Sequence, residues 1–333
     1  MGASSSAQLA IVPAAGGAVY DAGAAAVRAA PLAAPTLGLA PALAAPTLAA
    51  SLPATSAAPV PARGFEKPSG RAHTLTGDVR FKRDFRSAAL GNSRTIAVYL
   101  PPGYDSSNER YPVLYMQDGQ NLFDAATAFG GNEWGIDETC EKLMRSGELP
   151  PFIVVAVYNT GDRISEYSPA PDAEYGGGRG DLYGEFLINE LKPYVDANLR
   201  TLPDAEHTGL MGSSLGGLIS LHLGLGHPDV FSRIAALSTP LWWADGELAR
   251  RLASSPSAEI RPRVWLDAGT REKNASDRIA EMRGLGEALK ARGWREGDDL
   301  AVRVIDGAGH NERSWGERGA DVLKFLFPVR TQP

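Results

Sequence analysis

The sequence has a single cysteine, Cys140, among its 333 residues. One thiol cannot form an intramolecular disulfide, and it cannot supply a cysteine-based zinc site. The chain also has no H-E-x-x-H motif, and its five histidines are scattered rather than clustered. We therefore expect neither a metal nor a cofactor, and we interpret Cys140 as an ordinary residue of a helix predicted over residues 135–146.

Long apolar runs and an excess of basic charge are also absent. No apolar run reaches the roughly 18 to 20 residues that a membrane-spanning helix needs. The net charge of −6 argues against nucleic acid as a partner. The first 17 residues carry no lysine or arginine, so they do not match a secretory signal. We expect a soluble protein without a membrane span, and both a cytoplasmic and an exported location remain open, as does the oligomeric state.

Residues 1–64 differ in composition from the rest of the chain. They consist almost entirely of Ala, Pro, Leu, Ser, Thr, Gly and Val, and their only charged residues are Asp21, Arg28 and Arg63. Proline recurs too often for a helix to form. We interpret residues 1–64 as a disordered leader or linker that precedes a catalytic domain over residues 72–330.

The domain alternates between strand and helix patterns. Strands are expected near Leu210 and over residues 94–100, 113–116, 152–157, 234–237, 264–267 and 301–305, and helices over residues 135–146, 181–199, 215–225, 277–292 and 320–327. This alternation predicts an α/β fold with a mainly parallel central sheet and helices on both faces. Such sheets carry their functional groups beyond the carboxyl ends of the strands.

A pair of serines lies at one of these strand ends, in the stretch GLMGSSLGG over residues 209–217. Residues 212–216 fit the motif G-x-S-x-G, with a strand before it and an apolar helix after it. A sharp turn from strand to helix strains its central residue and leaves no room for a Cβ atom on its neighbours. Ser214 is therefore the candidate nucleophile, whereas Ser213 has the wrong offset in the motif.

A serine hydroxyl needs a base, and His310 is the best placed histidine. It follows the last strand in the loop GAGHNERSW and comes after Ser214 in chain order. A carboxylate should hold the imidazole, and the stretch VWLDAGTREKN between them offers two. We favour Glu272, in the flexible loop, over Asp267, which ends the strand; Asp306 is a weaker third choice.

Two backbone N–H groups should stabilise an oxyanion near Ser214. Leu215, directly after the serine, supplies the first. The second should come from YMQDGQNLF, the loop after the strand 113–116. We choose the N–H of Gln120, with Asn121 as the alternative.

Two further side chains are candidates for binding substrate. Arg163 follows the strand 152–157 and could bind a carboxylate or a phenolate, or else form an ion pair with Glu166 or Asp172. Trp242 follows the strand 234–237, where an aromatic ring suits a sugar or a phenolic acyl group, although it could equally belong to the core.

On the basis of these motifs, residues 85–328 resemble the putative esterase family of α/β hydrolases. The motifs that carry the resemblance are SSLGG, GTREKN, GAGHNERSW and YMQDGQNLFD, together with LPPGYD, DRISEYSP, LKPYVDANLRT and STPLWW. The resemblance is strongest to the enterochelin-esterase-like subgroup, and it implies an α/β-hydrolase fold with Ser214, Glu272 and His310 as the triad. Gln117 departs from the family pattern because many members carry histidine there.

Three functional hypotheses follow. The first is a serine esterase acting on a small-molecule or carbohydrate-linked ester through an acyl-enzyme on Ser214. The second is an acyltransferase that passes the same acyl group to an alcohol. The third is a binding protein that has kept the fold without turnover, although none of the three triad residues has been lost.

Overall fold

A computed structural model of the chain describes residues 61–69, 73–254 and 260–329. Apart from residues 61–64, the expected leader lies outside these residues. Residues 61–69, which precede the predicted start of the domain at residue 72, already contact the domain. The Arg63 N–H donates to Asn198 O at 3.0 Å, Glu66 pairs with Phe81 of the first strand, and Phe65 is buried.

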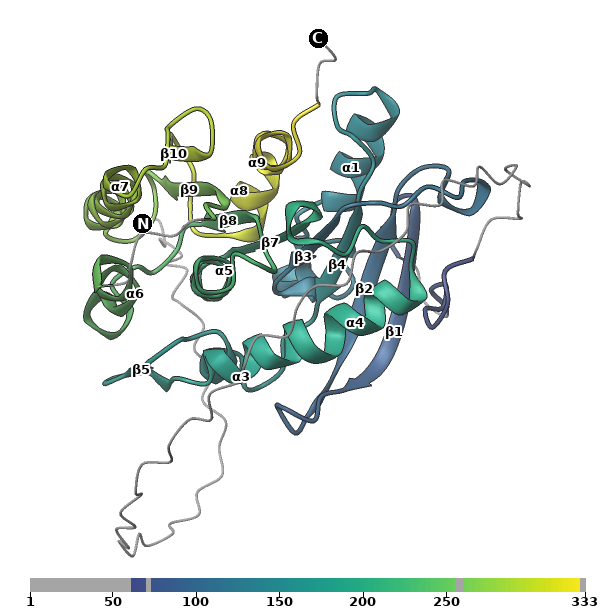
Figure 1. Ribbon diagram of the computed structural model, residues 1–333, viewed down its shortest axis with the longest axis horizontal. Helices are drawn as coiled ribbons and strands as arrows, with labels where there is room; N and C mark the ends of the chain where they lie inside the picture. Colours follow the sequence, from purple (N-terminus) through teal and green to yellow (C-terminus); the bar gives the residue numbers. More distant parts are fainter. Residues whose placement is uncertain (1–60, 70–72, 255–259, 330–333) are drawn as a thin grey trace, which may run out of the picture. The chain divides into compact units, whose positions relative to one another are not determined.

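One eight-stranded sheet organises the domain (Figure 1). Its strand order is β1-β2-β4-β3-β7-β8-β9-β10. The strands β1 and β2 are antiparallel to their neighbours, and the other six run parallel. The bounds are β1 Asp78–Arg86, β2 Ser93–Leu100, β3 Val113–Met116, β4 Ile153–Val157, β7 Thr208–Ser213, β8 Arg233–Leu237, β9 Arg263–Gly269 and β10 Leu300–Ile305. The predicted mainly parallel sheet is confirmed.

Helices cover both faces of this sheet, and a separate apolar core lies under each layer. One core contains side chains of α1 (Ile136–Arg145) and α9 (Gly319–Leu326), which flank the same side of the sheet in Figure 1. The other contains side chains of α3 (Gly180–Glu185), α5 (Leu215–Gly226), α6 (Trp243–Ser254) and α7 (Ala275–Ala291). Alternate residues of β2 enter opposite cores, because successive strand side chains point to opposite faces.

The helix predicted over residues 181–199 forms with one irregularity. Between α3 and α4 (Lys192–Asn198) the chain makes wider, π-type turns over Phe186–Leu191. Pro193 lies just after these turns, in the first turn of α4, where its missing N–H costs little. The break in the regular helix therefore comes before the proline.

The remaining elements are short. They are the helices α2 (Arg163–Glu166) and α8 (Glu312–Glu317), the small hairpin of β5 (Pro171–Asp172) and β6 (Gly176–Gly177), and the single 3₁₀ turns Tyr104–Ser106, Gly119–Asn121, Phe129–Gly131 and Ala205–His207. Within the described residues, no helix combines the length and the apolar character needed to cross a membrane. The parallel strands carry most of the candidate functional residues just past their carboxyl ends.

Candidate active site

Ser214 occupies the sharp turn between β7 and α5. Its backbone has φ 52° and ψ −130°, a strained conformation for a residue with a side chain, and its N–H donates to Leu237 O at 2.9 Å. A Cβ on Gly212 would lie 2.5 Å from the carbonyl group of Gly216, so only glycine fits there. Ser214 is partly exposed at the start of α5, whereas Ser213 is buried in β7.

The imidazole of His310 faces a carboxylate. Its Nδ1 lies 3.1 Å from Oε2 of Glu272; the Glu272 side chain is almost fully buried, and that of His310 is 35% exposed. The Ser214 hydroxyl makes no hydrogen bond to His310 in this structure. In unliganded enzymes such catalytic contacts are often long and shorten only when substrate binds.

Hydrogen bonds connect the turn at Ser214 to this pair. Leu237 accepts from the Ser214 N–H, and the next residue, Ser238, donates from Oγ to Oε1 of Glu272 at 2.6 Å. The Gly269 N–H donates to the same oxygen at 2.6 Å. Burial alone would raise the pKa of Glu272, but the hydrogen bonds from His310, Ser238 and Gly269 outweigh it and hold the pKa below its usual value.

Asp267 and Asp306, the alternative acids, have other partners. Asp267 is buried and accepts two hydrogen bonds from the Arg318 guanidinium, at 3.0 and 2.8 Å, and one from the Trp265 indole at 2.8 Å. Burial raises its pKa despite the neighbouring arginine. Asp306 is exposed and accepts from the Thr270 hydroxyl at 3.1 Å. Neither carboxylate bonds to His310.

The three candidate donors for an oxyanion differ in whether their N–H groups are already used. Among the described residues, no hydrogen bond engages the N–H of Leu215 or of Gln120. The Asn121 N–H, the alternative, donates to Asp118 O at 2.9 Å. Gln120 is held on both sides, because its Oε1 accepts from the Asn159 N–H and its carbonyl accepts from the Thr127 hydroxyl.

The ion pair expected for Arg163 forms with a different residue. Its guanidinium donates twice to Asp118, from Nε at 2.6 Å and from Nη2 at 2.8 Å. Glu166 instead pairs with the fully buried Arg94. The prediction of Glu166 or Asp172 was therefore wrong. Asp118 belongs to the same loop as Gln120, so this ion pair helps to hold the loop in place. The Arg163 side chain remains 29% exposed.

Trp242 belongs to an aromatic cluster after β8. Its ring centroid is 5.9 Å from those of Tyr175 and Trp243, and the Arg278 guanidinium lies 5.0 Å from it. Its indole nitrogen is buried with no hydrogen-bond partner in the structure. A buried N–H donor without a partner is unusual.

Several polar and apolar residues around the site were not predicted from the sequence. Ser238 and Arg318 contact the acids described above. Glu312, two residues after His310, lies 3.4 Å from the Asn121 amide, and burial together with the charge of Asp118 raises its pKa. Phe129 lies on a surface turn with 64% of its area exposed, and its backbone N–H donates to Asn121 Oδ1. Only tertiary contacts distinguish these residues, although Glu312 lies within the quoted histidine motif.

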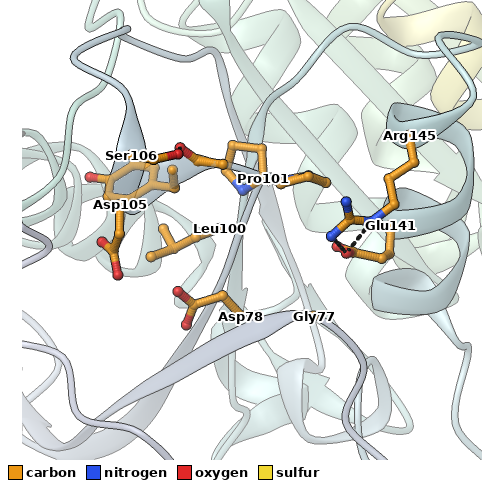
Figure 2. A pocket seen from close by; sticks show the side chains of 11 residues that line it. Gly77, Asp78, Leu100, Pro101, Asp105, Ser106, Glu141 and Arg145 are labelled. Carbon is orange, nitrogen blue, oxygen red and sulfur yellow. Dashed lines mark hydrogen bonds and ion pairs between the residues drawn. The ribbon is translucent and has the colours of Figure 1, made fainter.

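A cavity of about 440 Å³ opens at the opposite edge of the sheet. Figure 2 shows its lining, with Pro101 near the centre and the ion pair between Glu141 and Arg145 at one side. Leu100 ends β2, which runs antiparallel to β4, so this cavity lies at the amino-terminal edge of the parallel strands. None of the candidate catalytic residues lines it. Across the described residues, no group of three or more His, Cys, Asp or Glu side chains could hold a metal ion.

Comparison with known proteins places the chain in a family. A family model described as putative esterase matches residues 87–324. The uncharacterized protein YbbA of Bacillus subtilis is 26% identical over 71% of this chain and 93% of its own length. An endo-1,4-beta-xylanase/feruloyl esterase of Xylanibacter ruminicola is 29% identical over 73% of this chain but only 30% of its own length.

A solved structure shares the fold. The enterobactin esterase of Shigella flexneri, crystallised in the presence of enterobactin, aligns with a TM-score of 0.57 at 24% identity, over 76% of this chain and 61% of the other. Identity this low supports the fold alone, whereas the family model spans most of the described domain. The chain therefore belongs to the putative esterase family, and it is a carboxylic ester hydrolase with the α/β-hydrolase fold.

Proposed function

We propose that the chain hydrolyses esters through a covalent acyl-enzyme on Ser214. The Ser214 Oγ attacks the ester carbonyl carbon while its proton passes to Nε2 of His310. The tetrahedral intermediate collapses, the carbon–oxygen bond to the alcohol breaks, and His310 returns the proton to the departing alkoxide. Water then attacks the acyl-enzyme with His310 again as the base, releasing the acid and the free serine.

In this proposal Glu272 holds the imidazole in one tautomer and stabilises its charged form. The observation that carries the assignment is the 3.1 Å contact between His310 and Glu272, linked through Ser238 and Leu237 to the strained turn at Ser214. Asp267 makes no hydrogen bond to His310 and already neutralises Arg318.

The proposed oxyanion donors are the N–H groups of Leu215 and Gln120. Leu215 is the first residue of α5, a helix of 12 residues whose amino-terminal end favours developing negative charge. Gln120 lies in the loop after β3, and Gly119 allows that loop to pack closely, since a Cβ there would lie 2.6 Å from the backbone of Ala156. Both N–H groups are free to donate a hydrogen bond to an oxyanion.

For the substrate we propose a small-molecule or carbohydrate-linked ester with an aromatic or sugar group near Trp242. The Trp242 ring, which is only partly buried, and the neighbouring Arg278 suit an oxygen-bearing ring. Arg163, partly exposed beside Asp118, is the proposed contact for a carboxylate or phenolate. Relatives named for feruloyl and enterobactin esters make phenolic esters the first to test.

The test is turnover of p-nitrophenyl esters from acetate to palmitate and of methyl ferulate, with Ser214→Ala and Ser213→Ala compared. We expect Ser214→Ala to lower kcat at least about a thousand-fold, because the nucleophile is lost. Ser213→Ala should retain turnover, since that hydroxyl is buried in β7. Undiminished hydrolysis by Ser214→Ala would refute the proposal, and acyl transfer to an added alcohol in place of hydrolysis would favour the acyltransferase.

A further inference from the structure

Ser238 lies at the end of β8 in a strained conformation that its surroundings maintain. Its φ is 51°, a left-handed value that a non-glycine residue seldom adopts, and the residue is 3% exposed. Its N–H is held by Asp267, through the backbone carbonyl at 2.9 Å and the side chain at 3.2 Å. The backbone is thus fixed where the Ser238 side chain meets Glu272.

The Ser238 hydroxyl uses its whole hydrogen-bonding capacity. A hydroxyl has one proton to donate and two lone pairs to accept. Ser238 accepts from Trp315 Nε1 at 2.9 Å and from Arg318 Nη2 at 2.8 Å, which leaves its proton for Oε1 of Glu272 at 2.6 Å. Because both lone pairs are occupied, the direction of the bond to Glu272 is determined.

This bond separates the roles of the two carboxylate oxygens. Oε1 of Glu272 accepts from Ser238 and from the Gly269 N–H, whereas Oε2 faces Nδ1 of His310. Rotation of the carboxylate would break two short hydrogen bonds inside a buried site, where lost bonds are costly. The carboxylate is therefore fixed with one oxygen toward the imidazole.

The two donors to Ser238 are themselves anchored near the site. Arg318 is 5% exposed, and Asp267 neutralises its charge through the two hydrogen bonds described above. The Trp315 ring meets His310 edge to face, with centroids 5.0 Å apart. A buried cation and an indole N–H therefore both polarise the hydroxyl that holds Glu272.

We propose that Ser238 is a positioning residue that orients Glu272 toward His310, with Arg318 and Trp315 fixing its hydroxyl and Asp267 fixing Arg318. This inference rests on the proposed triad. It gives Asp267 a role different from the catalytic one considered for it: Asp267 acts on the site only through Arg318 and Ser238.

The experiment compares Ser238→Ala with the wild type, using a short-chain p-nitrophenyl ester and a phosphonate titration that counts competent sites. We expect kcat per competent site to fall by about ten- to a hundred-fold through misplacement of the base, with KM little changed. The matched control is Ser87→Ala, because that buried hydroxyl accepts from the Leu90 N–H in the turn after β1, far from Glu272 along the sheet. Its kcat per competent site should stay at the wild-type value.

A second comparison separates positioning from simple loss of packing. If Ser238 acts through Glu272, Ser238→Ala should cause little further loss in a Glu272→Ala background. Trp315→Phe supplies an independent variant that keeps an aromatic ring beside His310 while removing the N–H donor, and it should show a smaller loss of kcat with the same non-additivity. If Ser238→Ala does not fold, Trp315→Phe alone tests the inference.

Two results would overturn the inference. One is a wild-type kcat per competent site in both Ser238→Ala and Trp315→Phe. The other is a loss from Ser238→Ala that is equally large with and without Glu272. Either result leaves the proposed function intact as long as Ser214→Ala is inactive, whereas an active Ser214→Ala refutes the proposed function itself.

Discussion

At the scale of single residues, each buried charge near the proposed nucleophile has a definite partner. Glu272 faces His310 while two other donors hold its second oxygen, Asp267 neutralises Arg318, and Asp118 pairs with Arg163. Buried charges without partners are costly, so the pairing determines which carboxylate is free to face the imidazole. The partners of Asp267 are Arg318 and Trp265, which is why we propose Glu272 rather than Asp267 as the acid of the triad.

The depressed pKa of Glu272 predicts how stability responds to acid. A carboxyl whose pKa is lower in the fold than in the unfolded chain contributes stability above its ordinary value of 4.5 and loses it as the pH falls further. Glu272→Gln should therefore be less stable than the wild type at pH 7, and the gap should close below pH 4.5. Urea unfolding between pH 7 and pH 3 measures this, and curves that stay parallel would contradict it.

The proposed triad residues were predicted from sequence because they have local signals. Ser214 lies in a motif and His310 follows the last strand, whereas Glu272 was favoured over Asp267 for its place in a flexible loop and through the family resemblance. The partner of Arg163 could not be found in this way, because Asp118 is 45 residues away and nearer carboxylates competed for it. Ser238 was missed for a similar reason, since its role depends on Arg318, 80 residues later.

At the scale of elements, the turn between β7 and α5 is a tight steric fit. The strand end and the helix start approach each other at Gly212 and Gly216, and a Cβ on Gly217 would lie 2.3 Å from the Thr239 hydroxyl. The strained backbone at Ser214 persists because these neighbours leave it no alternative.

Replacing Gly212 should therefore damage both the turn and the activity. The added Cβ of Gly212→Ala would meet the Gly216 backbone at 2.5 Å, and we expect a cost of about 1–3 kcal/mol in the free energy of unfolding together with lower kcat. Gly284→Ala in α7 is the matched control, because a Cβ there meets nothing within 4 Å. Chemical denaturation and ester turnover of both variants test this, and equal behaviour would contradict it.

Most elements of the sheet were predictable because their apolar patterns are regular. The strand 113–116 was predicted with the bounds that β3 has, and the other predicted strands match within a few residues. The strand β1 was missed: it is rich in charged residues, and a bulge between Lys82 and Phe85 breaks its alternation. The helix α6 was missed as well, and its first turn contains left-handed residues at 244–246. In both cases a local irregularity interrupts the sequence pattern from which the element would have been predicted.

At the scale of the whole domain, two apolar cores enclose the sheet, and one of them covers a buried carboxyl group. Asp137 of α1 is fully buried; its Oδ2 accepts from the Thr76 N–H at 2.7 Å, and its Oδ1 has no hydrogen-bond partner in the structure. Burial, together with the nearby carboxylate of Glu138, raises the pKa of Asp137 to about 9.

This raised pKa predicts a loss of stability as the pH rises from the ordinary value of 3.8 toward about 9. A carboxyl whose pKa is higher in the fold stabilises it fully below the ordinary value of 3.8, and that contribution falls as the pH rises toward about 9. Asp137→Asn should remove this dependence, by at most about 1.4 kcal/mol per pH unit, and should be the more stable protein at pH 8.5. Thermal or urea unfolding from pH 5 to pH 9 measures the slope, and an unchanged slope would contradict it.

The identity of the nucleophile is the claim on which the rest depends, and it can be measured directly. The wild-type protein, Ser214→Ala and Ser213→Ala would each be treated with a fluorophosphonate. Intact-mass spectrometry would count the adducts, and peptide mapping would locate the labelled residue. We expect one adduct per chain, on Ser214, in the wild type and in Ser213→Ala, and none in Ser214→Ala. An adduct on another residue, or an unlabelled wild type that still hydrolyses esters, would contradict it.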